Sequence, residues 1–127
     1  MAKSAGHTGD APEPAGPYSQ SVRAGSFVAA AGQVGIDPQT GEVVSEDIRE
    51  QSRQALKNVQ AVLAASGATL GDVIRLGVFL TSLDDFGPMN EIFEEMLPEP
   101  LPARTTVYVS LPPKLKIEID ALAITED

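Results

Sequence analysis

The chain has 127 residues, the size of one ordinary domain, and 43% of them are hydrophobic, enough for a core. It contains no cysteine, which excludes disulfides, thiolate zinc sites and a thiol nucleophile. The formal net charge is −9 and only nine Lys and Arg are present, so we expect no nucleic-acid partner. No run approaches the roughly 20 apolar residues of a membrane span, and residues 1–14 lack the apolar stretch of a signal peptide. We therefore expect a soluble, cytoplasmic protein without a membrane partner.

The N-terminal part is rich in turn-forming residues. Residues 1–15 contain mostly small residues and proline, and this composition predicts a mobile tail ahead of a single domain over residues 16–127. The domain opens with two predicted strands at residues 18–23 and 27–34, joined by a hairpin turn at residues 24–26.

Two segments show helical periodicity. Apolar residues recur on one face over residues 48–66, which predicts the first helix. The second helix carries Met89, Ile92, Phe93 and Met96 on its inner side, and we expect Asp84 or Asp85 to cap its start. A proline-rich connector follows and cannot continue the helix.

Three further strands complete the domain. Residues 72–80 alternate strongly, with Ile74, Leu76, Val78 and Leu80 predicted to face the helices, and the last two strands begin near Arg104 and Lys116. These elements predict an α+β fold, a mixed sheet of about six strands with two helices packed on one face. The other face is mixed, with Val73, Arg75, Gly77 and Phe79 on the same strand, and is poorly suited to water, so we expect a second subunit to cover it.

Arg104 and Glu118 carry the candidate chemistry. A guanidinium cannot lose its proton on burial, so an enclosed Arg104 needs an anion. That anion is either Glu118, in a structural ion pair, or the carboxylate of a ligand. Alternation along the strands places Arg104 with Thr106, and Glu118 with Asp120, and we expect both polar sides to lie on the subunit-facing surface.

Two other residues bear on function. His7 is the only histidine and lies in the predicted tail, which argues against histidine-based catalysis and most zinc sites. Tyr18 follows a stiff Gly-Pro turn and is either a half-buried aromatic or a hydroxyl at a pocket rim. No metal site is expected.

Several short motifs together resemble a known family. In chain order they are Gly16-Pro17-Tyr18-Ser19-Gln20, Gly32-Gln33, Asp37-Pro38-x-Thr40-Gly41-Glu42-Val43, Gln54-Ala55-Leu56-x-Asn58-Val59, Val78-Phe79-Leu80, Asn90, Pro102-Ala103-Arg104-x-Thr106-Val107 and Ile117-Glu118-Ile119-x-Ala121. Their order and spacing over about residues 12–124 are similar to the Rid family, also called the YjgF or L-PSP family of enamine/imine deaminases.

The resemblance implies a fold, an assembly and an activity. It implies a chorismate-mutase-like homotrimer with clefts between subunits, and hydrolysis of 2-aminoacrylate-type enamines or 2-iminopropanoate-type imines to 2-keto acids and ammonia, without a cofactor. By resemblance Arg104 grips the substrate carboxylate, Glu118 positions the attacking water and Tyr18 lines the cleft from a neighbouring chain.

The same resemblance assigns the remaining pocket residues. Asn90, Gly32 and Thr106 shape the pocket, and Ala31 stands where many active members have Ser or Thr. The missing hydroxyl leaves an alternative open, a trimer that binds 2-keto acids and regulates a partner without turnover. Ribonuclease activity is disfavoured by the acidic charge and the lack of a usable histidine.

Overall fold

The computed structural model describes residues 2–126. Within this range the strands and helices are, in chain order, β1 (Lys3–Gly6), β2 (Ser21–Ala24), β3 (Phe27–Val34), α1 (Ile48–Ala64), η1 (Leu70–Asp72), β4 (Val73–Leu80), η2 (Leu83–Asp85), α2 (Phe86–Met96), β5 (Ala103–Tyr108) and β6 (Ile117–Ile124). The two η elements are short 3₁₀ turns.

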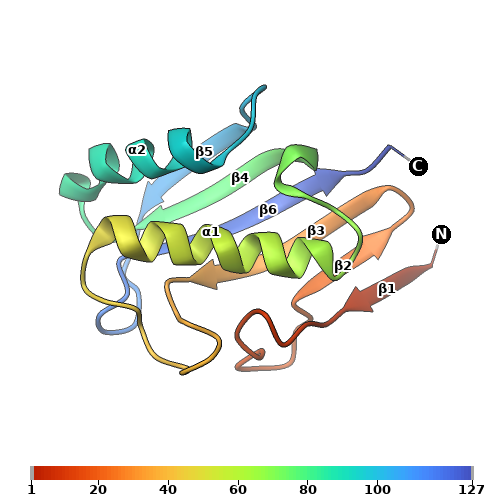
Figure 1. Cartoon of the computed structure of the whole chain (residues 1–127), viewed down its shortest axis with the longest axis horizontal. Helices are drawn as coiled ribbons and strands as arrows, with labels where there is room; N and C mark the ends of the chain where they lie inside the picture. Colours follow the sequence, from red (N-terminus) through yellow and green to blue (C-terminus); the bar gives the residue numbers. More distant parts are fainter. Residues whose placement is uncertain (1, 127) are drawn as a thin grey trace.

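The strands form one mixed sheet. Its six strands lie in the order β1-β2-β3-β6-β4-β5, and β5 runs parallel to β4 while the other neighbours are antiparallel. Both α-helices cover the same face of the sheet, and the described part of the chain leaves the other face uncovered (Figure 1). The predicted α+β fold is confirmed.

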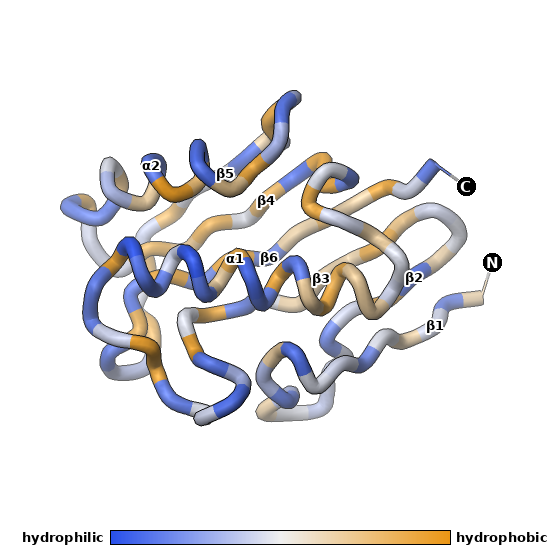
Figure 2. The backbone as a smooth tube through the Cα atoms, in the orientation of Figure 1, coloured by the Kyte–Doolittle hydropathy of each residue, from blue (hydrophilic) through white to orange (hydrophobic). Residues whose placement is uncertain are grey.

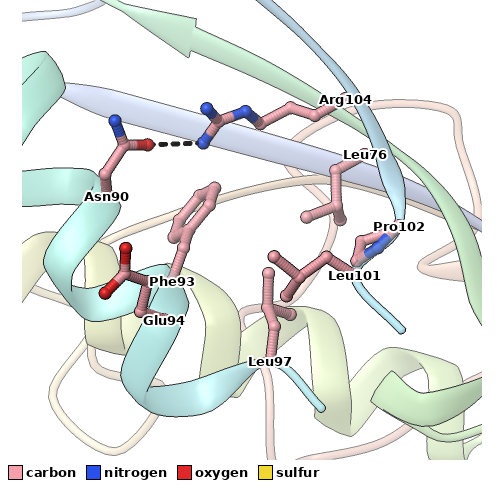
Figure 3. A pocket seen from close by; sticks show the side chains of 8 residues that line it. All are labelled: Leu76, Asn90, Phe93, Glu94, Leu97, Leu101, Pro102 and Arg104. Atoms are coloured by element: carbon pink, nitrogen blue, oxygen red, sulfur yellow. Dashed lines mark hydrogen bonds between the residues drawn. The ribbon is translucent and has the colours of Figure 1, made fainter. Parts of the chain in front are cut away.

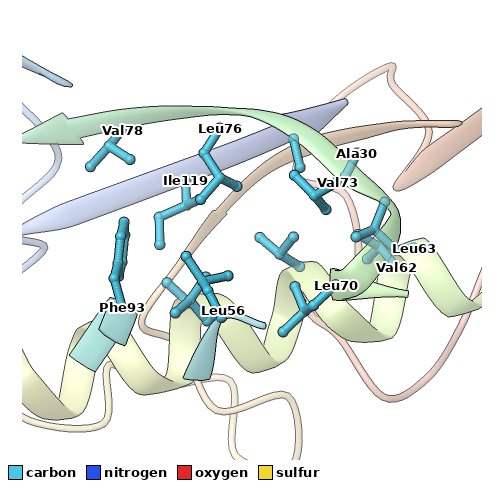
Figure 4. Packing of buried hydrophobic residues seen from close by; sticks show 14 of the residues in the cluster. Ala30, Leu56, Val62, Leu63, Leu70, Val73, Leu76, Val78, Phe93 and Ile119 are labelled. Atoms are coloured by element: carbon cyan, nitrogen blue, oxygen red, sulfur yellow. The ribbon is translucent and has the colours of Figure 1, made fainter. Parts of the chain in front are cut away.

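The core fills the space between the helices and the sheet. Hydrophobic positions recur along α1 between hydrophilic ones (Figure 2), which gives the helix one apolar stripe. Leu56 and Leu63 of α1 are fully buried there, with Phe93 of α2 toward the Leu56 end of the cluster (Figure 4). The side chain of Asp47 caps the start of α1 by accepting from the Arg49 backbone N at 2.9 Å.

The N-terminal segment differs from the predicted mobile tail. Lys3–Gly6 form the edge strand β1, which pairs antiparallel with β2. The loop after β1 is held by Gln20, whose buried side chain accepts from Thr8 N at 2.7 Å and donates to the Pro12 carbonyl at 2.9 Å. Composition alone does not show that a distant amide satisfies the backbone of this loop.

Three local expectations need correction. The first predicted strand begins later, at Ser21. Val73 faces the core and Ile74 is 46% exposed, because a bulge between Val73 and Arg75 reverses the alternation at the start of β4. Asp85 is the N-cap residue of α2 as expected, but its side chain makes no capping hydrogen bond; Ser82 instead caps the preceding η2, where its Oγ accepts from Asp84 N at 3.2 Å.

Within residues 2–126, no helix combines the length and the apolar character that crossing a bilayer requires.

Candidate functional site

Arg104 lies on the helix-covered face of the sheet. Parallel pairing sets Arg104 beside Leu76 and Thr106 beside Val78, and paired residues share a face. Leu76 and Val78 are fully buried under the helices. Because β5 is the edge strand, the Arg104 side chain rises past the sheet edge and reaches α2 (Figure 3).

The Arg104 guanidinium is fixed by contacts with α2. Its Nη1 donates a 2.7 Å hydrogen bond to Oδ1 of Asn90. Its Cζ lies 5.5 Å from the ring centroids of both Phe86 and Phe93, within cation–π range. Among the described residues, no carboxylate lies within salt-bridge distance of Arg104. The guanidinium is therefore held in place, and its other N–H groups form no ion pair with a carboxylate of the described chain.

A cavity of about 490 Å³ opens beside this guanidinium. Its walls come from β4, α2, the connector after α2 and β5: Leu76, Asn90, Phe93, Glu94, Leu97, Leu101, Pro102 and Arg104 (Figure 3).

Thr106 lies two residues after Arg104 on β5. Its hydroxyl oxygen is buried and has no hydrogen-bond partner among the described residues. A buried hydroxyl without a partner is costly, but Thr106 is not among the residues that line the cavity.

Glu118 lies on the opposite face of the sheet. Its neighbours Ile117 and Ile119 are fully buried under the helices, so alternation turns Glu118 to the uncovered face. Its carboxylate leans across Gly32 of β3, where a Cβ would overlap Oε2 of Glu118. The β-bulge between Ala30 and Gln33 contains this glycine, and the missing side chain leaves the space that the carboxylate uses.

Glu118 has a perturbed carboxyl group. Partial burial raises its pKa above the ordinary glutamate value, and the neighbouring carboxylate of Asp120 raises it further. Asp120 stands in a similar position two residues along β6, where it leans across Gly77 of β4. No arginine or lysine of the described chain forms an ion pair with either carboxylate.

Tyr18 lies close to Gly32. Both line a second cavity, of about 140 Å³, formed between β3 and the loop after β1. The Tyr18 hydroxyl accepts from Ala15 N at 3.1 Å, and the ring is 51% exposed. Ala31 precedes Gly32 in the same bulge of β3. Tyr18 is thus placed at a pocket rim.

The candidate residues form two separate groups. We call Arg104, Asn90 and Thr106 the cationic group, and Glu118, Tyr18, Gly32 and Ala31 the acidic group. The prediction that Arg104 and Glu118 share a face is wrong, and the chain forms no internal ion pair between them. Alternation shows which residues of a strand share a side, but it does not show which face of the sheet that side is. The register of β5 against β4 places Arg104 on the helix-covered face.

Sequence reasoning missed the aromatic contacts of Arg104. Helical periodicity predicts a core position for Phe93 and no role for Phe86. The available signal was the spacing of Phe86, Asn90 and Phe93, which places all three on one face of α2 at i, i+4 and i+7.

Comparison with known proteins places the chain in a family. Residues 8–125 match the family model described as Endoribonuclease L-PSP. The chain belongs to the Rid (YjgF/L-PSP) family. A RutC family protein of Pyrococcus horikoshii is 50% identical over 120 residues, covering 94% of this chain and 95% of the relative. The family resemblance seen in the sequence is confirmed.

Other Rid relatives carry more specific names. A 2-iminobutanoate/2-iminopropanoate deaminase of Dermatophagoides farinae is 40% identical over 117 residues, covering 91% of each chain. The crystal structure of Escherichia coli TdcF with bound serine superposes with a TM-score of 0.89 at 40% identity, covering 97% of this chain and 99% of that one. These similarities support a deaminase-type enzyme.

Proposed function

We propose that this protein hydrolyses small reactive 2-enamine and 2-imino acids, of the 2-aminoacrylate/2-iminopropanoate type, to 2-keto acids and ammonia. One observation carries the proposal: Arg104 is a fixed guanidinium with no carboxylate partner among the described residues. A planar guanidinium binds a carboxylate through two charge-assisted hydrogen bonds. The deaminase name of the mite relative supports the same substrate class.

The active site is composite. The cationic and acidic groups lie on opposite faces of one sheet, so a substrate held by Arg104 cannot reach Glu118 of the same chain. A chorismate-mutase-like homotrimer joins the cationic group of one chain to the acidic group of its neighbour. The uncovered face supports assembly, since Phe27 and Val107 on it are 48% and 39% exposed.

The chemistry follows from these roles. Glu118 orients a water molecule and takes one of its protons while the water oxygen attacks the carbon of the protonated imine. Glu118 returns this proton to the amino group of the tetrahedral adduct, and the C–N bond breaks to release ammonia. The hydroxyl proton of the adduct passes to Glu118 and on to solvent as the carbonyl of the 2-keto acid forms. In the separate chain burial and Asp120 raise the pKa of Glu118, and in the assembly the neighbour's guanidinium favours the ionised carboxylate that accepts the proton. The imine carbon is already electrophilic, so the step needs neither metal nor organic cofactor.

Release of pyruvate and ammonia from 2-aminoacrylate generated in situ tests the proposal. The wild-type protein accelerates the release, and Arg104→Lys loses on the order of 100-fold in kcat/KM because a point charge does not replace the bidentate fork. Arg49→Lys is the matched control, since Arg49 is an exposed arginine of α1 paired with Glu91. Equal rates for wild type and Arg104→Lys would end the proposal.

A second candidate function is metabolite binding without turnover. Ala31 favours this function, because its methyl group in the β3 bulge supplies no hydroxyl to the second cavity, which the neighbouring Gly32 lines. This candidate predicts that calorimetry detects 2-keto acids bound by the wild type and lost in Arg104→Ala, with no deamination above background.

A further inference from the structure

We propose that the cavity beside Arg104 binds the side chain of the substrate, and that the preferred substrates are 2-imino acids with an aliphatic side chain of about four carbons. This inference rests on the proposed function and names its substrate class. It follows from the shape of the cavity, its size and one exposed leucine.

The cavity has a polar end and an apolar end. At the polar end, Asn90 of α2 meets the guanidinium of Arg104 (Figure 3). The side chains of Leu76, Leu97 and Leu101 gather at the other end (Figure 3). A ligand that matches both ends carries an anion at one end and an apolar chain at the other.

The volume exceeds what a three-carbon acid needs. The cavity holds about 490 Å³, within the range of roughly 300–1,000 Å³ that accommodates whole drug-sized ligands. Bound by its carboxylate at Arg104, a three-carbon acid leaves the leucine-lined end filled with water. A longer aliphatic chain displaces that water and gains affinity through buried apolar area.

The exposure of Leu101, one of the lining residues, adds to this argument. Leu101 lies between Pro100 and Pro102 on the connector that leads into β5, and it is 52% exposed although it is a large apolar residue. Opposite it, Leu76, Phe93 and Leu97 are buried in the core, so the floor of the cavity is rigid. An aliphatic ligand covers Leu101 from this side.

Glu94 sets a limit on the substrate class. Glu94 of α2 is one of the residues that line the same cavity. A second carboxylate on the ligand would meet this like charge, so the cavity selects monocarboxylic acids.

Binding and turnover of a chain-length series test the inference. Calorimetry compares pyruvate with 2-oxohexanoate, and kinetics compare the imino acids of the same chain lengths. We expect at least tenfold tighter binding and higher kcat/KM for the six-carbon member, since each buried methylene contributes roughly fourfold. Leu101→Trp fills the apolar end and lowers the six-to-three-carbon ratio at least fivefold, whereas Leu83→Trp, on the 74% exposed Leu83 of η2, preserves it.

The outcomes separate this inference from the proposed function. Deamination with equal affinities for pyruvate and 2-oxohexanoate overturns the inference and leaves the deaminase proposal standing. A chain-length preference in binding without any deamination supports the cavity assignment and overturns the catalytic proposal. A ratio that Leu101→Trp leaves unchanged overturns the cavity assignment, and absence of any keto-acid binding overturns both.

Discussion

The cationic and acidic groups differ in what each one lacks. The cationic group presents a guanidinium that is fixed by an amide and two aromatic rings but has no carboxylate within salt-bridge distance in the described chain. The acidic group presents Glu118, whose pKa is raised by burial and by Asp120, with no cation paired to it there. Each group supplies the charge that the other is missing. In the proposed function, one chain thus supplies two halves of a site from opposite faces of its sheet.

The largest effect on the acidic group is expected from Gly32→Ala. The new Cβ overlaps the Glu118 carboxylate, whose flexible end moves away without disturbing the backbone. Because a displaced general base loses its alignment with water, we expect kcat to fall on the order of 100-fold at unchanged thermal stability. Gly87→Ala is the control, since a Cβ there meets open space among the described residues. A fully active Gly32→Ala protein would remove Glu118 from the mechanism.

Asn90→Asp tests whether the cation is vacant. The aspartate carboxylate stands where the Asn90 amide oxygen accepts from Arg104, so it forms an ion pair with the guanidinium and competes with the substrate carboxylate. We expect KM to rise roughly tenfold or more, from a loss of about 1.4 kcal/mol or more in binding. Asn90→Ala removes only the hydrogen bond and raises KM less. Similar KM values for the two variants would show that the guanidinium is not the anion site.

Phe86→Leu measures the aromatic support of Arg104. Phe86 is 39% exposed, so the substitution tests the ring without opening the core. Loss of one cation–π contact is worth about 0.5–1 kcal/mol, which predicts a two- to fivefold rise in KM at nearly constant kcat. Phe86→Tyr keeps the ring and restores the wild-type KM. A Tyr variant as impaired as the Leu variant would assign the effect to packing alone.

The smallest effect is a pH-dependent change in the free energy of unfolding. The raised pKa of Glu118 means that the folded chain binds this proton more tightly than the unfolded chain does. The resulting stability is complete below the unfolded pKa and is lost as pH rises through the folded pKa. Glu118→Gln should therefore be more stable than wild type at pH 7, and the difference should disappear near pH 3.

Denaturant unfolding at high dilution, where the chains are separate, measures the difference in free energy of unfolding between Glu118→Gln and the wild type. In the proposed assembly the neighbour's Arg104 lowers the pKa of Glu118, so the advantage of Glu118→Gln should shrink as protein concentration rises. An advantage of the same size at both pH values would point to packing rather than to charge.

Sequence periodicity predicted the elements better than the site. The bounds of β3, Phe27–Val34, and the start of α1 at Ile48 follow from turn signals and helical spacing. The face of Arg104 depended on β5 running parallel to β4, and nothing local in β5 encodes that pairing. The strand at Lys3–Gly6 depended on pairing with β2, a long-range contact that a small-residue composition conceals.

Subunit complementation tests the composite site most directly. Arg104→Ala and Glu118→Gln chains are each expected to be inactive. When they are co-expressed and assemble at random, about a quarter of the junctions join an intact Arg104 to an intact Glu118 of the neighbour, so about a quarter of the wild-type activity should return. If the mixed assemblies stay as inactive as the separate variants, the two groups do not meet between chains.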